Sequence, residues 1–243
     1  MEIITFGVGG RQRECDRILN GTLSGEGRLI VLPIPTSRDN RYITDTDKTV
    51  EDIEKMLDGN TLLAGYNLPR ELSRHGGVTY DASLDEDFLL ENAILTANGC
   101  LGYILTHSEK DISRLKIGVV GYGRIGKELM RLMLIMGSSP RLYTTRESVA
   151  VEMGKMGVNA EIIHNGSDIF GLDILINTAP ARLIDTSRVG EETLIIDLAS
   201  GRAIDPDERL VRLSSVPDAM YPKTAGELYA GHIISYFKKE GVL

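Results

Sequence analysis

Short apolar runs that end in glycine, proline or a small polar residue alternate with helix-period stretches along most of the chain. Runs of about four to eight apolar and β-branched residues are typical of buried strands, and strands that alternate with helices pair in parallel. The expected strands begin with ITF near the N-terminus and continue at residues 28–35, 61–67, 78–82, 116–120, 141–145, 161–164, 173–180, 193–200 and 211–217. The pattern predicts an α/β fold with two lobes, a Rossmann-type doubly wound parallel sheet and a smaller flavodoxin-like α/β domain.

Apolar positions at helical spacing predict helices between these strands. Leu129, Leu132, Met133 and Met136 fall at i, i+3, i+4 and i+7 and predict one core-facing helix face. From Phe88 to His107 the spacing also suits a helix, but NAILTANG predicts a tight corner, so this stretch is expected to be a bent connector between domains. The other helices are expected at residues 11–19, 50–57, 127–136, 147–156 and 224–239.

Two glycine-bearing strand-to-helix turns, one in ITFGVGG and one in VVGYGRIG, indicate two α/β lobes with a cleft between them. We place a substrate-side α/β domain at residues 1–90 together with 222–243, and a dinucleotide-binding Rossmann domain at residues 91–221. The helix from Thr224 is assigned to the first domain, because its apolar positions must pack somewhere and the second sheet is already complete.

The composition of the chain disfavours nucleic-acid binding and indicates many tight turns. The chain has 27 basic and 35 acidic residues, a formal charge of −8, which repels phosphate backbones and disfavours nucleic-acid partners. Glycine is the outlier, since 26 of 243 residues is about 11%, against an ordinary usage of roughly 7%. Many tight turns or close approaches of backbone to a ligand are implied.

Several classes of site have no signature in this sequence. Cys15 and Cys100 form no paired pattern, and the four histidines are scattered without HExxH or CxxC, so no metal is expected. No GxSxG elbow is present. No basic leader and no apolar stretch of roughly 18 residues is evident, which predicts a cytoplasmic protein without a membrane partner.

The second glycine turn carries the chemistry. Gly121, Gly123 and Gly126 follow a predicted strand and open a predicted helix, the context of a dinucleotide site. The first glycine permits a tight turn, the second lets backbone approach a pyrophosphate, and the third allows close packing of helix and strand. The helix N-terminus would supply N–H groups and partial positive charge. The alternative is a turn with three purely structural glycines.

The end of the next strand predicts which nicotinamide cofactor is bound. NAD sites place an acid there for the ribose hydroxyl, whereas this chain has Thr144, Thr145 and Arg146, which could hold a 2′-phosphate. NADP is therefore favoured over NAD. Alternatively, Arg146 is a solvated residue that pairs with Glu147.

The first glycine turn has two interpretations. It could bind a ligand phosphate or carboxylate with Arg11 and Arg13 as anion clamps, or these arginines could belong to a solvated helix face.

Several segments of the sequence show a family resemblance that together covers most of the chain. The segments GGRQRE, LPIP, AGYN and ENAILTANG are similar to the first part of the dipicolinate synthase A-subunit family of spore-forming bacteria. Further along, KIGVVGYGRIGKELMRLMLIMGS, YTTRES, DILINTAPA, LIIDLAS and YPKTAGELYA resemble the same family more closely. More distantly, the chain looks like the D-2-hydroxyacid dehydrogenases.

The resemblance implies an NADP-dependent oxidoreductase that oxidises and dehydrates a hydroxy-tetrahydrodipicolinate to dipicolinate during sporulation. It also implies a small dicarboxylate substrate, a homo-oligomer (a dimer by analogy with similar two-lobed proteins) and a second synthase subunit. Two alternatives stay open: a non-catalytic or regulatory NADP-binding subunit, or else a related oxidoreductase for another small carboxylic acid.

The glycine turn, the strand ends and the resemblance together define the candidate site residues. Substrate binding is expected from Arg11, Thr36, Ser37 and Asn67. The catalytic candidates are Asn92, Thr96, Asn98 and Lys223. Cofactor binding is expected from Gly121, Tyr122, Gly123, Arg124, Ile125, Gly126, Thr144, Thr145, Arg146, Asn177, Thr178, Ala179, Pro180, Asp197, Leu198 and Ala199.

The chain also departs from these families. No histidine lies between His164 and His232, where the hydroxyacid dehydrogenases carry a catalytic one, so their ordinary mechanism is disfavoured. In the synthase family a TAEG acid stands where this chain has Asn98, and an amide cannot replace a carboxylate in proton transfer. Only Gly21 to Gly27 separates the first helix from the second strand, so the first domain is expected to lack one strand-and-helix unit.

Overall fold

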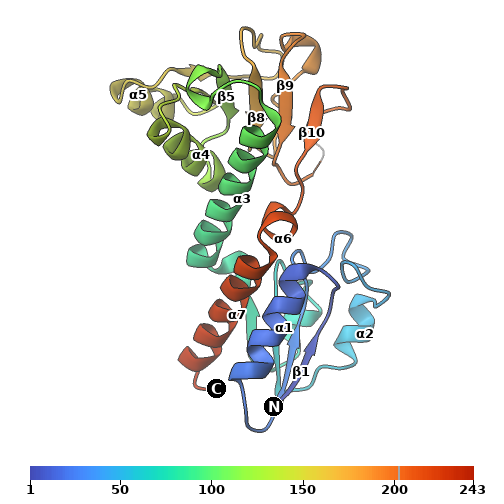
Figure 1. Cartoon of the computed structure of the whole chain (residues 1–243). Coiled ribbons are helices and arrows are strands. Elements are labelled where there is room, and N and C mark those ends of the chain that lie inside the picture. Colours follow the sequence, from blue (N-terminus) through green and yellow to red (C-terminus); the bar gives the residue numbers. More distant parts are fainter. Residues whose placement is uncertain (202) are drawn as a thin grey trace. The chain divides into compact units, whose positions relative to one another are not determined.

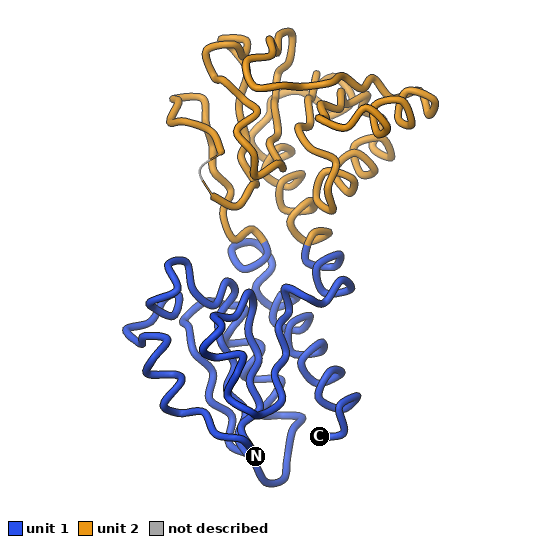
Figure 2. Tube along the Cα trace, turned by 180° about the vertical axis from the view of Figure 1, so that it is seen from behind, with its two compact units in different colours: residues 1–92, 217–243 blue, residues 93–216 orange. Residues whose placement is uncertain are grey.

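The computed structural model describes residues 1–201 and 203–243 and divides the chain into two compact units. The first unit comprises Met1–Asn92 and Pro217–Leu243, and the second comprises Ala93–Val216 (Figure 2). The sequence prediction placed the two boundaries at 90/91 and 221/222. The differences fall inside helices, whose interiors carry no boundary signal in the sequence.

The first unit contains a four-stranded parallel sheet with helices on both faces (Figure 1). Its strand order is β1-β2-β3-β4, without the reversal of the flavodoxin order 2-1-3-4-5. A flavodoxin sheet without its second strand has the order 1-3-4-5, and the chain is short at that point, between Gly21 and Gly27. The elements are β1 (Glu2–Thr5), α1 (Gly10–Thr22), β2 (Arg28–Val31), α2 (Val50–Glu54), β3 (Thr61–Gly65), η1 (Leu72–Arg74), β4 (Thr79–Asp81), η2 (Ala82–Leu84) and α7 (Pro222–Lys239).

Helix α7 packs along α1 on one face of this sheet (Figure 1). Gly226 permits the close approach, because a Cβ there would lie 2.5 Å from Glu14 Cβ and 2.7 Å from the Arg11 carbonyl oxygen. The apolar positions of the terminal helix therefore pack on the first unit, the domain to which the sequence analysis assigned this helix. The core on this face contains Cys15, Leu19, Phe88, Tyr229, Ile233 and Phe237. On the opposite face, Ile30 and Leu63 of the sheet pack with Ile53 of α2.

The second unit contains a six-stranded parallel sheet whose order, β10-β9-β8-β5-β6-β7, is the Rossmann order 3-2-1-4-5-6 read from the opposite edge. This confirms the doubly wound sheet expected from the alternating pattern. The elements are η3 (Ile112–Arg114), β5 (Ile117–Val120), α4 (Arg124–Ile135), β6 (Arg141–Thr144), α5 (Glu147–Lys155), β7 (Ala160–Ile162), β8 (Ile174–Asn177), η4 (Thr186–Arg188), β9 (Leu194–Asp197) and β10 (Leu210–Arg212). Helix α6 (Val216–Met220) follows this sheet.

The predicted corner at NAILTANG is wrong, because α3 runs unbroken from Glu86 to His107. Gly99 is buried in the interior of this helix. A single interior glycine costs about 1 kcal/mol relative to alanine, and packing of neighbouring residues such as Ala97 and Cys100 offsets that cost. The motif therefore lies on a helix face rather than at a turn.

Helix α3 also meets the length and composition expected of a membrane span, contrary to the sequence prediction that no stretch would. Its mean hydropathy is 1.3, and 44% of the 18-residue window lies buried within the protein. Core helices of soluble proteins meet the same two criteria, so these properties alone are weak indications of a membrane.

The predicted apolar face of α4 is correct for its first half. Leu129 and Met133 are fully buried, together with Met130, which the spacing did not include. Met136 is 38% exposed, because α4 ends at Ile135 and the chain turns away at Gly137.

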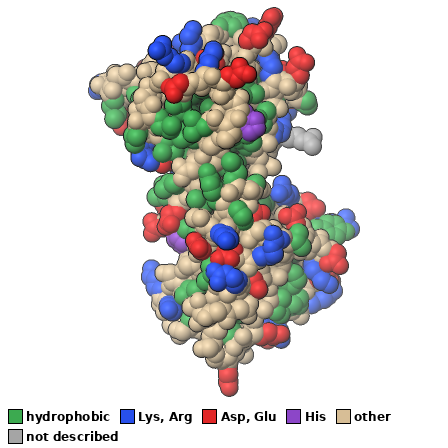
Figure 3. All heavy atoms as spheres, viewed as in Figure 1, with side chains coloured by type: hydrophobic (Ala, Val, Ile, Leu, Met, Phe, Trp, Pro, Cys, Tyr) green, Lys and Arg blue, Asp and Glu red, His purple; other side chains and the backbone are tan. Residues whose placement is uncertain are grey.

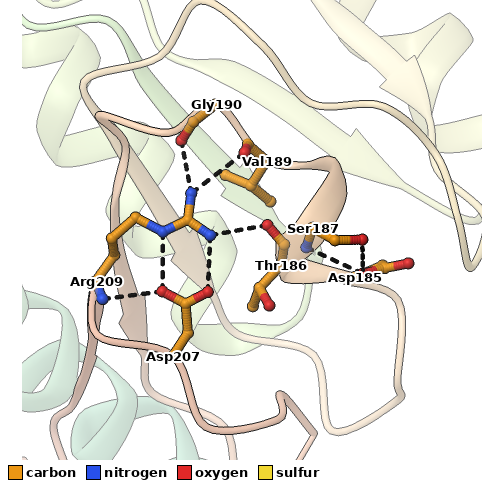
Figure 4. Close-up of polar contacts among 7 residues, drawn as sticks. All are labelled: Asp185, Thr186, Ser187, Val189, Gly190, Asp207 and Arg209. Atoms are coloured by element: carbon orange, nitrogen blue, oxygen red, sulfur yellow. Dashed lines mark hydrogen bonds and ion pairs between the residues drawn. The ribbon is translucent and has the colours of Figure 1, made fainter.

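One arginine fastens the loop before β9 to the segment before β10 (Figure 4). Arg209 Nε and Nη2 donate to the two carboxylate oxygens of Asp207 at 2.8 and 2.7 Å. Its Nη1 donates to the carbonyl oxygens of Gly190 and Val189 at 2.8 and 3.2 Å, and Nη2 donates to that of Thr186 at 2.8 Å. Each guanidinium nitrogen therefore has an acceptor, and the pKa of Asp207 lies well below its usual range because Arg209 donates to it.

We predict that Arg209→Ala lowers the free energy of unfolding by about 2 kcal/mol, because charge-assisted hydrogen bonds are lost and carbonyl acceptors are left without a donor. Since the folded-state pKa of Asp207 is depressed, its contribution is complete above about pH 4 and declines as the pH falls toward that folded-state pKa. Urea unfolding of the wild type and of Arg209→Ala at about pH 7 and about pH 3 measures the loss, which should be smaller at the lower pH. Arg188→Ala, which removes the exposed pair with Asp168, is the matched control and should have little effect; equal losses would contradict the prediction.

Candidate functional site

The glycine turn after β5 requires glycine at two of its three positions. Gly121 has φ +96°, and its N–H donates to the Tyr143 carbonyl oxygen at 2.8 Å. A Cβ on Gly121 would lie 2.7 Å from Thr178 Oγ1. A Cβ on Gly126 would lie well inside 3.0 Å of the Gly121 carbonyl oxygen. The turn is therefore packed against the end of β8, the strand beside β5 at which the sheet order reverses.

Gly123 is different, because no atom of the described residues lies within 4 Å of a Cβ built on it. It is the exposed N-cap residue of α4, and no side-chain capping hydrogen bond is formed there. The first turn of α4 thus presents backbone N–H groups and the positive end of the helix dipole beside an open position. A phosphate group fits such a helix N-terminus, and the three glycines have the roles expected of a dinucleotide turn.

Arg146 lies beside this turn. Its Nη2 donates to the Tyr122 carbonyl oxygen at 2.7 Å, and the side chain is exposed. The ion pairs found among residues 1–201 and 203–243 do not include one with Glu147, the pairing that the alternative interpretation assumed. Thr145 is also exposed, whereas Thr144 is buried and accepts from the Arg146 N–H at 3.2 Å. Two of the three residues predicted for a 2′-phosphate are thus solvent-accessible.

The polar side chains at the ends of β8 and β9 bind one another. Asn177 Nδ2 donates to Asp197 Oδ1 at 2.9 Å and to the Ala179 carbonyl oxygen at 3.1 Å. Asp197 Oδ2 accepts from Arg212 Nη1 at 2.6 Å, so both of its oxygens have donors. These side chains therefore hold the two loops together. The backbone N–H groups of Thr178, Ala179, Leu198 and Ala199 also donate within the protein, so these loops offer a cofactor backbone carbonyl groups rather than N–H donors. Arg212 was not foreseen, because the sequence does not show the register of β10 against β9, which places Arg212 opposite Asp197.

Arg11 is the most buried arginine of the first unit, with 5% of its surface exposed. Its Nη2 donates to Asn92 Oδ1 at 3.1 Å, and its buried Nε has no hydrogen-bond partner among the described residues. Burial lowers the pKa of Arg11, and the nearby Asp218 carboxylate opposes that change. A buried cation with a free donor is suited to a carboxylate ligand. The structure thus brings together Arg11 and Asn92, two residues that were predicted separately.

The N-terminus of α1 is already matched with an internal anion. The Arg11 backbone N–H donates to Asp218 Oδ1 at 2.6 Å. The first glycine turn was predicted to bind a ligand phosphate or carboxylate with Arg11 and Arg13 as clamps, and the structure places a protein carboxylate at the helix N-terminus beside it. Arg13 is exposed and donates to the Val8 carbonyl oxygen, so only Arg11 keeps the character of an anion clamp. Sequence reasoning missed Asp218, which is 207 positions from Arg11.

The other substrate candidates make hydrogen bonds within the loops after β2 and β3. Thr36 Oγ1 accepts from the Tyr66 N–H at 2.9 Å, and Ser37 Oγ donates to the Tyr42 carbonyl oxygen at 2.7 Å. Asn67 has φ +53° and an exposed side chain at the end of the β3 loop. The two hydroxyls therefore shape the loops, and only Asn67 leaves its side chain exposed.

The remaining catalytic candidates are spread over two helices. Lys223 is exposed in the first turn of α7. Thr96 is buried and Asn98 half-buried on α3, in the part that belongs to the second unit. Among residues 1–201 and 203–243, no group of three or more histidine, cysteine or acidic side chains could hold a metal ion.

Comparison with known proteins gives one sequence relative and several structural ones. The dipicolinate synthase A-subunit of Bacillus subtilis (strain 168) is 26% identical over 160 residues, which is 60% of this chain and 52% of the relative. The match therefore spans about half the length of that protein. No family model matches the chain.

Solved structures of the same protein share the fold. The dipicolinate synthase A-subunit from Bacillus subtilis has a TM-score of 0.78 at 17% identity, over 98% of this chain and 96% of that one. Its counterpart from Bacillus halodurans has a TM-score of 0.75 at 19% identity, over 97% of both chains. The apo D-lactate dehydrogenase from Escherichia coli is more distant, with a TM-score of 0.56 at 11% identity over 99% of this chain and 98% of that one. The predicted resemblances and the Rossmann-like α/β fold are confirmed.

We predict that alanine substitutions at Gly126 and Gly123 differ in their effects on stability. Gly126→Ala should cost about 2 kcal/mol, because its Cβ would meet the Gly121 backbone, which cannot move freely. Gly123→Ala should cost under about 1 kcal/mol, since the position is open and only N-cap preference is affected. Urea unfolding measures both, and equal costs would contradict the packing described for this turn.

Proposed function

We propose that the chain is an NADP-dependent oxidoreductase that resembles the dipicolinate synthase A-subunit, converting a hydroxylated tetrahydrodipicolinate to dipicolinate. The reaction removes one water, and the oxidation transfers a hydride to oxidised NADP and releases a proton. One observation carries the proposal: an intact dinucleotide turn at the switch point of the second sheet, in a chain similar to that protein over 160 residues.

The second unit supplies the residues for the cofactor. The first turn of α4 and the open backbone at Gly123 suit a pyrophosphate, and Thr145 and Arg146 suit the 2′-phosphate of NADP. The cofactor supplies the hydride acceptor, and the protein's contribution is to bind and orient it. Thr178 holds the turn in place, since its Oγ1 donates to the Val120 carbonyl oxygen at 2.9 Å.

The first unit supplies a group for the dianionic substrate. Arg11 has a guanidinium that is oriented by Asn92, and its Nε–H has no acceptor within residues 1–201 and 203–243. In a site of low dielectric constant, such a donor binds a carboxylate more strongly than an exposed arginine would. Arg11 is therefore the residue we assign to substrate binding with the strongest structural support.

Partner subunits are part of the proposal. Hydrophobic side chains gather on the visible face of the second unit in the region of α4 (Figure 3), where Leu134 and Ile135 are 44% and 70% exposed. Exposed apolar areas favour contact with another protein chain. We assign this surface to oligomerisation or to a second synthase subunit, in a cytoplasmic assembly.

A non-catalytic NADP-binding subunit is the second candidate function. Asn98 favours it, because the resemblance places a carboxylate at this position and an amide cannot transfer a proton in its place. The candidates differ in turnover rather than in cofactor binding.

We predict that NADP binds more tightly than NAD and that Arg146→Ala weakens NADP binding by about 10- to 100-fold with little effect on NAD, because it removes a charge-assisted hydrogen bond to the 2′-phosphate. Fluorescence titration with both cofactors measures this. Arg131→Ala removes the same charge from an exposed side chain of α4, paired with the more buried Glu128, and should change neither affinity. Equal wild-type affinities for the two cofactors would contradict the NADP assignment.

We predict that the protein, with freshly generated hydroxy-tetrahydrodipicolinate and NADP, forms reduced cofactor and dipicolinate in equal molar amounts. The absorbance of the reduced cofactor and of the pyridine ring measures the two products. Arg11→Ala should lower kcat/KM by about 100-fold, the effect of losing a charged hydrogen bond in a buried site. Cofactor binding without turnover, with or without a partner subunit, would favour the non-catalytic candidate.

A further inference from the structure

We propose that Asp218 is a positioning residue of the anion site, which fixes the backbone at Arg11 from α6 while leaving the guanidinium available for a ligand carboxylate. This inference rests on the proposed function, because it assigns Arg11 to a dicarboxylate ligand. Asp218 and Arg11 both belong to the first unit.

The N-terminus of α1 takes its acceptor from outside the helix. Its N-cap is Gly9, which has no side chain to accept a hydrogen bond from the first turn. Asp218 supplies the missing acceptor, since its Oδ1 lies 2.6 Å from the Arg11 backbone nitrogen. An acceptor at this position satisfies one free N–H group and complements the positive end of the helix dipole. Asp218 is therefore an N-cap provided by a distant part of the chain.

Two glycines make space for this cap. A Cβ on Gly9 would lie 2.6 Å from Asp218 Oδ2, so the carboxylate lies where a side chain of residue 9 would be. A Cβ on Gly10 would lie 2.5 Å from Pro222 Cβ, at the start of α7. The two glycines thus let the segment from α6 to α7 approach α1 closely. The geometry also indicates that a carboxylate at residue 9 could replace Asp218.

The Arg11 guanidinium is held without a direct ion pair among the described residues. Asp218 binds the backbone of Arg11, and the ion pairs of the described residues do not include one to the Arg11 side chain. Asn92, a neutral acceptor, binds one Nη atom, and Nε has no partner in the described part of the chain. A bidentate carboxylate on the side chain would have occupied the donors that a ligand needs. The arrangement holds the cation in place and keeps its charge unneutralised by direct pairing.

The experiment uses the 243-residue chain and measures dipicolinate binding by calorimetry, NADP binding by fluorescence, and unfolding in urea. We expect Asp218→Ala to weaken dipicolinate binding by about 10-fold, as expected when a ligand contact is misplaced, with the NADP affinity unchanged. The double variant Gly9→Asp/Asp218→Gly should return the dipicolinate affinity to within about 3-fold of wild type. Glu227→Ala, which removes an exposed carboxylate from α7, is the control and should bind dipicolinate as wild type does.

The outcomes separate positioning from a purely structural cap. Wild-type dipicolinate affinity in Asp218→Ala, with only the stability reduced, would overturn the proposal. So would a double variant that regains stability but not affinity. Equal dipicolinate binding by wild type and Arg11→Ala would instead overturn the assignment of Arg11 in the proposed function, whatever the Asp218 variants do. Weakened dipicolinate binding in Asp218→Ala, with recovery in the double variant, would support the positioning role of Asp218.

Discussion

The N–H groups in the first turn of a helix need acceptors, and this requirement distinguishes the two glycine turns of the protein. Both turns follow a first strand and place glycine at the helix N-cap. At α1 the acceptor is the Asp218 carboxylate, which arrives from the other end of the chain. At α4 the position beside Gly123 is open, and no side chain in the described part of the chain caps the helix. Both turns therefore have a glycine N-cap, but the α1 turn is neutralised by a carboxylate of the protein, whereas the α4 turn is suited to an external anion.

Close packing around these turns determines which groups remain for ligands. In the second unit, Asn177, Asp197 and Arg212 hydrogen-bond to one another at the strand ends. Cofactor recognition then depends on backbone groups and on the exposed Arg146. In the first unit, Arg11 is held at its backbone and at one side-chain nitrogen, and its Nε is unpartnered among the described residues. Each unit thus combines rigid support with a small number of free donors.

Much of the fold was predictable because it depends on local pattern. Apolar runs located the strands of both sheets, and the glycine spacing located the dinucleotide turn. The predicted corner at NAILTANG was wrong because the cost of one interior glycine is smaller than the gain from burying its neighbours, which is a tertiary quantity. Met136 was misplaced for a related reason, since helical spacing does not show where the helix ends.

The sequence by itself determined the fold class, the position of the dinucleotide turn and the residue types at its strand ends, because these follow from short-range spacing and from the conformational freedom of glycine. Only the tertiary structure decided which of those residues are free. Asp218 meets Arg11 across 207 positions, and Arg212 meets Asp197 only because β10 pairs with β9. Hydrogen bonds between distant segments depend on strand order and helix packing, and neither is encoded in the spacing of residues within one segment.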